Sequence, residues 1–404
     1  MMSYQRTILS TLQQRLQGQR PLIQALLGPR QVGKTTLCHQ FMAQCHDQKM
    51  VYVSADEMLA GQELHWLAQQ WQIARIYAKQ SDVVLFIDEI QKIPQWSTQV
   101  KALWDEDQSH GVEIKVVVLG SSPLLMNARL TESLAGRFEV IPVTHWTYQE
   151  MRDAFDVSLE EYIYFGGYPG AIAFKAGHTR WRHYVRESLI EPSISKDILL
   201  LNRVDKPALL RQLFYVGCGY SGQVLSFHKI LGTLQDAGNT TTLAHYLKLL
   251  AGAGLLSGLE KYAQQMIRTR ASSPKFQVFN TALMSALQAQ PLTALLHDTA
   301  TWGRLVESAV GAHLVNGAMH TNLDILYWNQ SSHEVDFIIR SANKTLAIEV
   351  KSGAKATNTK GMALFKKAYP DVDVIMVGGQ GVPLDTFLLS QISDWVSWHG
   401  QPLR

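Results

Sequence analysis

Cysteine is scarce in this chain, and long apolar runs are absent from it. Cys38, Cys45 and Cys218 have no paired metal-ligand spacing, so they indicate free thiols in a reducing compartment rather than disulfides or a thiolate metal centre. No stretch approaches the ~18 consecutive apolar residues of a membrane span, and the first residues lack the apolar segment of a signal peptide. We therefore expect a cytoplasmic protein.

A large excess of either charge is also missing. The formal net charge is +3, with 18% charged and 46% hydrophobic residues, as in ordinary globular domains. Any basic surface that binds nucleic acid must therefore be local. The chain of 404 residues is long enough for roughly two to four domains, each with its own core.

The segment 28–36 fits the pattern of a glycine, four residues and Gly-Lys-Thr. A buried strand is predicted before it over 21–27, and a helix after it over 35–43. In such a loop, backbone amides and the helix N-terminus bind phosphate. Lys34 can reach the β- and γ-phosphates, and Thr35 can ligate Mg²⁺. The predicted nucleotide-binding residues are Gly28, Pro29, Arg30, Gln31, Val32, Gly33, Lys34, Thr35 and Thr36.

Two acids end the next strongly apolar run. Residues 83–87 predict a fully buried strand, and Asp88 and Glu89 follow it directly. Ligands of an open α/β sheet bind at the carboxyl ends of its strands, so both acids should lie near the phosphate loop. Asp88 is expected to hold Mg²⁺, and Glu89 to polarise the attacking water.

Two further elements extend the predicted site. A strand expected over 113–119 ends in Gly120-Ser121-Ser122, where a small hydroxyl side chain can sense the γ-phosphate. Arg137 follows a predicted helix and is a candidate finger that reaches the nucleotide of a neighbouring subunit.

The order of these elements resembles that of an AAA+ ATPase. The runs 28–35 and 85–91 are similar to a prokaryotic AAA+ family of predicted ATPases, and 164–170 matches the Gly-Gly-x-Pro element of that family. The family carries a C-terminal domain of unassigned function. The resemblance extends over nearly the whole chain and implies ATP and Mg²⁺ as cofactors.

The same resemblance assigns roles to individual residues. It implies that Ser121 or Ser122 is the first sensor, that Arg137 acts in trans, and that Gly167 and Pro169 lie in a helical lid near the adenine. No second-sensor arginine is identified. A trans-acting arginine requires neighbouring subunits, so we expect a ring, with a hexamer as the expected size.

The middle of the chain predicts short helices over 207–217, 227–234 and 241–253, with Thr240-Thr241-Thr242 as the N-cap of the third. A pair of strands is expected within 254–262. Three helices and a hairpin make a winged helix-turn-helix, a fold that often binds DNA.

A basic cluster is expected in and after this wing, from Lys261, Arg268, Arg270 and Lys275. The third helix is largely apolar, so contact with the DNA backbone is favoured over base-specific reading. Winged helices also dock proteins, and the cluster alone leaves that alternative open.

The last third of the chain carries a second set of polar residues. Glu307 lies in an apolar helix, Asp336 in a strand, and Glu349 and Lys351 on one face of a third strand. These are the parts of a PD-(D/E)xK nuclease site and resemble that fold. Asp336 and Glu349 would hold Mg²⁺, Lys351 would orient the water or offset phosphorane charge, and Glu307 would complete the metal's second side.

We therefore expect an α/β protein with an AAA+ P-loop parallel-sheet core, a helical lid, a winged helix and a restriction-endonuclease-like α/β domain. Their expected ranges are 1–146, 147–205, 206–272 and 273–404. The predicted function is an ATPase that acts on DNA, either by cleaving it or by translocating on it or remodelling it. The alternative from another class is a signalling or docking ATPase that binds protein.

Overall fold

The computed structural model describes residues 4–18, 22–58, 61, 63–121, 130, 133–200, 203–233, 238–263, 272–353 and 360–397. The chain divides into two compact units, Met1–Val143 and Thr144–Arg404. The first unit has the parallel-sheet α/β core that the sequence predicts.

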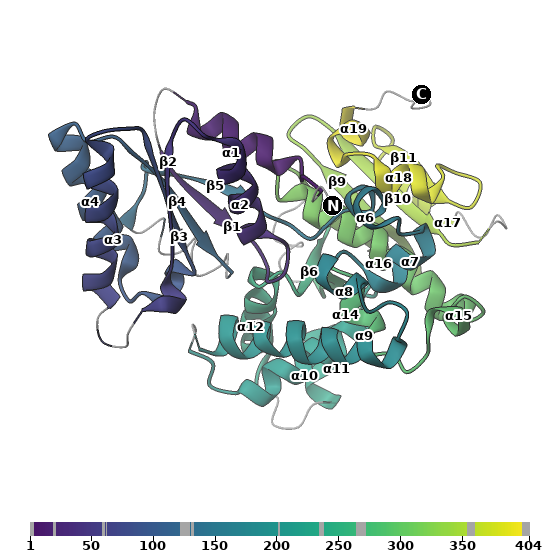
Figure 1. Cartoon of the computed structure of the whole chain (residues 1–404). Coiled ribbons are helices and arrows are strands. Elements are labelled where there is room, and N and C mark those ends of the chain that lie inside the picture. Colours follow the sequence, from purple (N-terminus) through teal and green to yellow (C-terminus); the bar gives the residue numbers. More distant parts are fainter. Residues whose placement is uncertain are drawn as a thin grey trace. The chain divides into compact units, whose positions relative to one another are not determined.

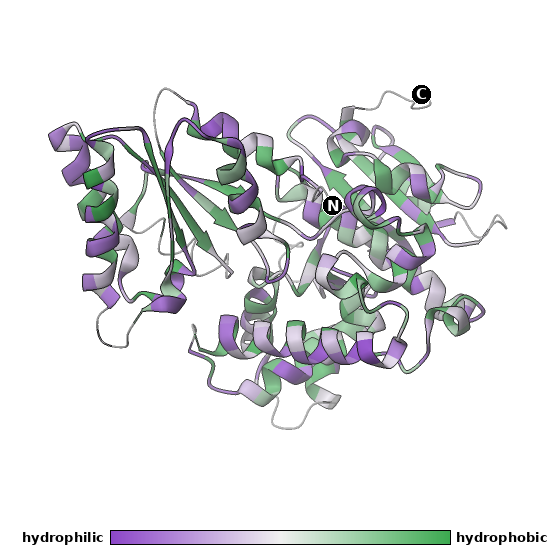
Figure 2. Cartoon of the chain, viewed as in Figure 1, coloured by the Kyte–Doolittle hydropathy of each residue, from purple (hydrophilic) through white to green (hydrophobic). Residues whose placement is uncertain are grey.

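A five-stranded parallel sheet forms the centre of the first unit (Figure 1), in the order β2-β3-β4-β1-β5. Its strands are β1 (Ile23–Leu27), β2 (Lys49–Ser54), β3 (Val83–Asp88), β4 (Ile114–Gly120) and β5 (Phe138–Pro142). They are runs of apolar residues because helices cover both faces of the sheet. The strands are accordingly among the most hydrophobic segments of the unit in Figure 2.

Helices lie on both faces of this sheet. One face is covered by α1 (Ile8–Leu16) and α2 (Lys34–Gln44), and the other by α3 (Glu63–Ala78) and α4 (Trp96–His110). Trp71 of α3 is fully buried, and Trp66 packs against the same core. Because all strands are parallel, their carboxyl ends meet at one edge of the sheet.

The second unit begins with a series of short helices. They are α6 (Tyr148–Phe155), α7 (Leu159–Phe165), α8 (Pro169–Ile172) and α9 (His178–His183), followed by the π-helical turns η3 (Tyr184–Ile190) and η4 (Ser193–Leu199). Thr147 and Ser158 each start a helix through a capping box, in which the N-cap and the third helical residue bond each other's backbone.

Three helices follow, as the sequence predicts: α10 (Pro207–Gly219), α11 (Phe227–Thr233) and α12 (Thr240–Gly252). The N-cap prediction for α12 is wrong, because Asn239 accepts the Thr242 amide hydrogen at 2.8 Å. The hairpin expected within 254–262 is also wrong. That segment contains the single strand β6 (Leu256–Lys261), whose antiparallel partner is the later strand β7 (Lys275–Val278).

A six-stranded sheet runs through the C-terminal part in the order β11-β10-β9-β8-β6-β7. Its other strands are β8 (Asp324–Gln330), β9 (His333–Arg340), β10 (Thr345–Lys351) and β11 (Asp373–Gly378). Strand β6 pairs with β7 on one side and with β8 on the other. The boundary expected at 272/273 therefore falls between two paired strands, and the finer domain division stays a prediction.

Helices flank this sheet. They are α14 (Ala282–Ser285), α15 (Leu292–Leu295), α16 (Thr299–Ala318), α17 (Lys360–Ala368), α18 (Leu384–Leu389) and α19 (Ile392–Ser397). The apolar face of α16 is buried, which places Glu307 beside the sheet rather than at the surface. Within the described part of the chain, no helix combines the length and apolar character that a bilayer crossing requires.

Candidate functional site

The loop between β1 and α2 needs glycine at both of its ends. A Cβ on Gly28 would lie 1.9 Å from the Val143 carbonyl oxygen. Gly33 has φ of +91° and is the N-cap of α2, a backbone conformation that other residues adopt at a cost of about 1 kcal/mol or more. Between them, Gln31 also has a positive φ of 61°. The loop thus has a tightly constrained path into the N-terminus of α2, as a phosphate loop requires.

Lys34 is held back onto this loop. Its ammonium donates to the carbonyl oxygens of Gly28 at 2.8 Å and Pro29 at 2.7 Å, and the side chain is buried. Both acceptors are neutral. A phosphate oxygen would offer a charge-assisted hydrogen bond, which is roughly twice as strong, so a bound nucleotide can draw the ammonium away from the carbonyls.

Asp88, at the carboxyl end of β3, accepts hydrogen bonds from two hydroxyl groups. Its Oδ2 accepts from the Thr35 hydroxyl at 3.0 Å and from the Tyr52 hydroxyl at 2.5 Å, while Oδ1 accepts from the Glu89 amide at 2.8 Å. Burial and the contact with Asp88 raise the pKa of Tyr52, so the phenol stays a donor. The converging oxygens of Thr35 and Asp88 are the ligands that Mg²⁺ prefers, and they fit the predicted ion.

Glu89 is held by the neighbouring side chain of Gln91. The Gln91 amide donates to Glu89 Oε2 at 2.6 Å and to the Ser121 hydroxyl at 3.1 Å. Burial raises the pKa of Glu89, against the opposing effect of Lys92 and Arg30. Gln91 therefore joins the predicted base to the predicted first sensor. Ser122, the alternative sensor, lies outside the described residues.

The other predicted loop residues differ in burial. Val32 is fully buried in the core beneath α1 and α2, Arg30 is half-buried near Glu89, and Thr36 is exposed at the start of α2. Their roles at a nucleotide stay predictions, as do those of the rest of the loop.

Arg137 lies at the opposite edge of the sheet. It precedes β5, whose Phe138 pairs with Ile23 at the start of β1, whereas the phosphate loop follows the end of β1. The five residues of β1 span about 16 Å, farther than an arginine side chain extends. The guanidinium donates to both carboxylate oxygens of Asp105, at 2.7 and 3.1 Å, and lies over the Trp104 ring.

The Gly-Gly-Tyr-Pro turn is docked inside the second unit. Gly167 donates its amide hydrogen to Asn280 Oδ1 at 3.1 Å, and a Cβ on it would lie 2.1 Å from the Trp146 carbonyl oxygen. Gly166 has φ of +68°, and Pro169 begins α8. Packing alone therefore explains both glycines. The predicted contact of Gly167 and Pro169 with the adenine stays a prediction.

The second set of predicted residues does come together, around a lysine. Lys275, on β7, is fully buried, and its ammonium lies 2.7 Å from Glu307 Oε1, 2.8 Å from Glu334 Oε1 and 3.7 Å from Asp336 Oδ1. It also donates to the Asp336 carbonyl oxygen at 3.1 Å. Burial opposes its charge, but the three carboxylates outweigh burial and raise the pKa of Lys275. The lysine therefore stays protonated.

Glu349 and Lys351 lie on the same face of β10, as predicted. The Lys351 ammonium donates to Glu349 Oε1 at 2.6 Å, and Glu349 Oε2 is buried without a hydrogen-bond partner among the described residues. Asp336 Oδ2 accepts from the Val350 amide at 2.7 Å. Burial and the neighbouring Asp336 raise the pKa of Glu349 to about 7. We refer to Lys275, Glu307, Glu334, Asp336, Glu349 and Lys351 as the acid–lysine cluster.

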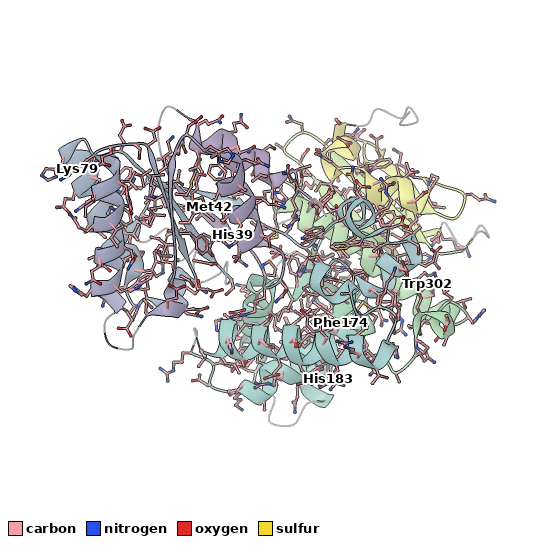
Figure 3. The ribbon with its side chains drawn as sticks, in the orientation of Figure 1. His39, Met42, Lys79, Phe174, His183 and Trp302 are labelled. Carbon is pink, nitrogen blue, oxygen red and sulfur yellow. The ribbon has the colours of Figure 1, made fainter. Side chains whose placement is uncertain are left out.

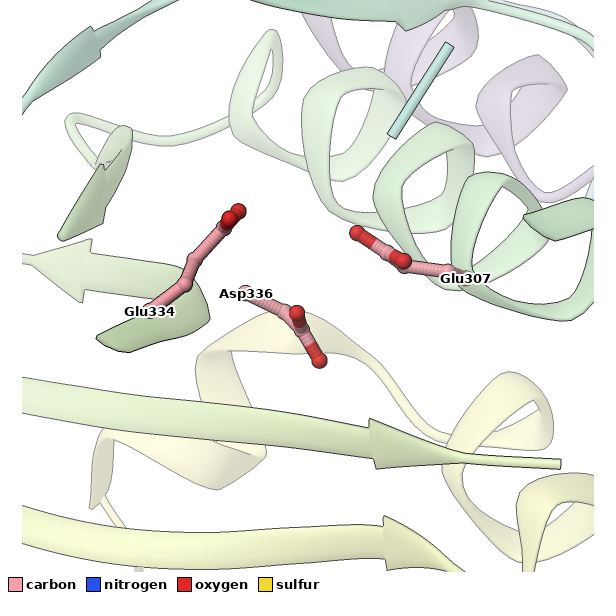
Figure 4. Close-up of side chains that lie close together, drawn as sticks. All are labelled: Glu307, Glu334 and Asp336. Atoms are coloured by element: carbon pink, nitrogen blue, oxygen red, sulfur yellow. The ribbon is translucent and has the colours of Figure 1, made fainter. Parts of the chain in front are cut away.

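Two cation positions in this cluster differ in how well an ion fits them. The carboxylates of Glu307, Glu334 and Asp336 converge (Figure 4), with ligand oxygens within 4.8 Å of one another. Lys275 lies within 4 Å of all three, so an ammonium already offsets their charge. The pair that the sequence predicts is different: Glu349 Oε2 has no hydrogen-bond partner among the described residues, and with Asp336 it would offer the carboxylate oxygens that suit Mg²⁺.

The expected basic cluster of the wing is not formed as predicted. Lys275 is buried and paired with acids, so it is unavailable to a partner. Arg268 and Arg270 lie outside the described residues, and Lys261 ends β6. The sequence interpretation missed the roles of Tyr52, Gln91, Lys275 and Glu334. The one signal for Lys275 was its position at the start of an apolar strand, where an exposed lysine is unexpected.

Family comparisons agree with the N-terminal site. Residues 20–152 match a family described as an AAA domain, residues 156–294 match a domain of unknown function, DUF8612, and residues 302–389 match another, DUF4143. No curated protein matches the sequence. The match to an AAA domain thus covers the phosphate loop, both acids at the end of β3 and Arg137.

Three solved structures match this chain at low identity. Aeropyrum pernix ORC1 in complex with DNA is 14% identical with a TM-score of 0.31, and the match covers 73% of this chain and 95% of that one. The Thermotoga maritima RuvB Holliday junction branch migration motor is 18% identical with a TM-score of 0.33, covering 63% and 90%. A structure from work on katanin self-assembly is 22% identical with a TM-score of 0.26, and the match covers 37% of this chain and 50% of that one.

Proposed function

We propose that this protein is an AAA+ ATPase that couples ATP hydrolysis to remodelling of DNA or translocation along it. The ATPase part is carried by one observation. Lys34 and Thr35 follow the phosphate loop, and Thr35 bonds Asp88, directly before the Glu89–Gln91–Ser121 chain of hydrogen bonds. These are the groups that phosphoryl transfer needs, on adjacent strand ends.

In the proposed reaction, the loop 28–33 and Lys34 bind the β- and γ-phosphates. Thr35 and Asp88 hold Mg²⁺, which neutralises phosphate charge when bound. Glu89 orients the attacking water and accepts its proton. Gln91 restrains Glu89, and its second bond to Ser121 lets the arrival of the γ-phosphate at Ser121 reposition the base.

Arg137 supports an assembly of subunits. Because it lies at the far edge of the sheet from the phosphate loop, it can stabilise transition-state charge only on a nucleotide that a neighbouring subunit holds. We propose a ring, with six subunits as the expected size. Asp105 bonds the guanidinium and must release it when the neighbour docks.

The DNA part is supported by an exposed basic face on α9 and η3. Arg180, His183 and Arg186 are exposed, and none of them forms an ion pair with another described residue. Figure 3 labels both His183 and Phe174, and the Arg180 guanidinium lies over the Phe174 ring, 4.6 Å from its centroid. No acid occurs from Lys175 to Arg186. Such a face suits phosphate contacts, which are independent of base sequence.

A nucleolytic form of the proposal is favoured by Glu349. Its Oε2 is buried without a partner among the described residues, while Oε1 is fixed by Lys351. Asp336 and Glu349 would hold one Mg²⁺, which would polarise a phosphodiester when bound. Lys351 would then orient the water or offset charge on the phosphorane.

Docking to protein is the competing function, and exposed apolar side chains favour it. Leu200 is 77% exposed, and Tyr215 and Tyr220 on and after α10 are 40% and 43% exposed. Aromatic side chains of this kind are enriched at protein interfaces.

The test is ATP turnover with single-stranded, duplex and four-way DNA. We expect DNA to stimulate turnover, and Arg180→Ala with Arg186→Ala to weaken DNA binding and lower the salt slope by about two units, one for each lost phosphate contact. Arg152→Ala, an exposed arginine of α6 paired with Asp153, is the matched control. If DNA neither binds nor stimulates ATP turnover, docking to protein becomes the better-supported function.

A further inference from the structure

We infer that Lys275 is the resident cation of Glu307, Glu334 and Asp336, so that the native chain takes no divalent ion between these carboxylates. The inference does not depend on the proposed ATPase or on DNA. It concerns only how the charges of the acid–lysine cluster are satisfied.

The distances match an ammonium in a carboxylate cage. Nζ lies 2.7 Å from Glu307 and 2.8 Å from Glu334, which is the range of charge-assisted N–H···O bonds. The ammonium also donates to the Asp336 carbonyl oxygen at 3.1 Å. It is therefore hydrogen-bonded to Glu334 and to this carbonyl, and ion-paired with Glu307. Mg²⁺ needs oxygen ligands at about 2.0–2.1 Å and has no room beside it.

The charges require each other. Three carboxylates that converge within 4.8 Å repel one another and attract a cation. A fully buried lysine without a counter-charge would be forced toward its neutral form. Neither half of the cluster is therefore stable without the other, and the lysine supplies from within the chain what a metal ion would otherwise supply.

The lysine also joins three elements that are distant in the sequence. Lys275 starts β7, Glu307 comes from α16, and Glu334 and Asp336 come from β9. The ammonium thus links β7 to β9 of the same sheet and to α16. It follows that Glu307 positions Lys275 instead of holding a metal, and that any ion at Asp336 and Glu349 is a single one.

The experiment counts bound Mn²⁺ by electron paramagnetic resonance in the nucleotide-free full chain. We compare the wild type with Glu307→Gln, Lys275→Met and the double variant, and use Lys275→Arg as the matched control that keeps the charge. Glu307→Gln should leave the number and affinity of bound ions unchanged. Lys275→Met should gain one Mn²⁺ with at least tenfold tighter binding, the double variant should lose that gain, and Lys275→Arg should gain none.

Two results would overturn the inference. One is loss of a bound Mn²⁺ in Glu307→Gln, which would mean that the wild type holds a metal ion there. The other is a Lys275→Met variant that keeps the wild-type circular dichroism and gains no ion. If Lys275→Met does not fold, the test rests on Glu307→Gln and Glu334→Gln. Unchanged Mn²⁺ binding in both variants supports a resident lysine, and reduced Mn²⁺ binding contradicts it.

Discussion

The two charged centres of this protein differ in how firmly their lysines are held. Lys34 rests on two neutral backbone carbonyls, and Asp88 is bonded by neutral hydroxyls. Lys275 rests on three carboxylates. A phosphate or a metal ion can displace the first set of partners with a gain in electrostatic energy, whereas it cannot displace the second without leaving buried charge unpaired.

This difference separates charges that a ligand can still engage from charges that are already paired. In the first unit, the charged groups lie in two short segments, after β1 and at the end of β3, and parallel pairing places both at one edge of the sheet. In the second, they come from separate elements and satisfy one another. Substitutions should therefore affect ligand binding and turnover in the first centre, and stability in the second.

The largest effect is expected from Arg137→Ala. ATP binding should be unchanged, whereas turnover should fall about 10³-fold, because arginine fingers contribute this much when they act in trans. The measurement is phosphate release at saturating ATP and a protein concentration at which the chain assembles. Asp105→Asn, which frees the same guanidinium, should not lower turnover. Equal rates for Arg137→Ala and wild type would contradict the role in trans.

Glu89→Gln should bind ATP with wild-type affinity and lose turnover by about 10²- to 10³-fold, the usual contribution of a general base. Nucleotide binding by fluorescence and single-turnover hydrolysis separate the two steps. Glu57→Gln, an exposed acid of the same unit, is the control and should behave as wild type. Hydrolysis by Glu89→Gln at the wild-type rate would show the acid assignment to be wrong.

Lys275→Met should lower the free energy of unfolding of the C-terminal unit by about 3 kcal/mol, because it leaves buried carboxylates without their counter-ion. Urea unfolding measures it. Lys344→Met is the control: Lys344 pairs with the half-exposed Asp373 at 3.1 Å, and a pair of this kind contributes under about 1 kcal/mol. Equal decreases in the free energy of unfolding for the two variants would contradict the difference between the buried cluster and a surface pair.

Gln91→Ala should reduce turnover by a smaller factor, about tenfold, as expected for a group that positions the base. The Gln91 amide donates to Glu89 and so favours the charged carboxylate. Burial already raises the pKa of Glu89, and loss of this hydrogen bond should raise it further. Turnover falls as the pH drops through that pKa, so the acid limb of the rate profile should move to higher pH. An unmoved acid limb would leave Gln91 a packing role only.

Much of the first unit follows from the sequence because its signals are local. The apolar runs that become β1, β3 and β4 and the loop 28–36 are contiguous, and parallel pairing then puts Asp88 and Ser121 near the loop. The role of Gln91 could not be predicted from the sequence, because it depends on a side-chain rotamer that bridges Glu89 and Ser121 at two strand ends. Tyr52 was missed because the carboxylate that its hydroxyl contacts belongs to Asp88 on the neighbouring strand β3, two residues beyond its register partner Phe86.

The second unit was harder to predict because its decisive contacts are long-range. The strand β6 was expected to turn back within 254–262, yet its partner β7 begins at Lys275. Local propensity could not reveal that choice, since β6 pairs with β7 on one side and with the distant strand β8 on the other. The alternation of Glu349 and Lys351 was local and was predicted correctly, whereas the pairing of Lys275 with Glu307 was not.

The central claim is that the loop after β1 binds ATP for hydrolysis. The most direct measurement is phosphate release from ATP with Mg²⁺ by the wild type, Lys34→Ala and the control Lys49→Ala, which removes an exposed lysine of β2. We predict turnover in the wild type and in Lys49→Ala, with binding and turnover lost in Lys34→Ala. Wild-type turnover in Lys34→Ala would contradict the claim.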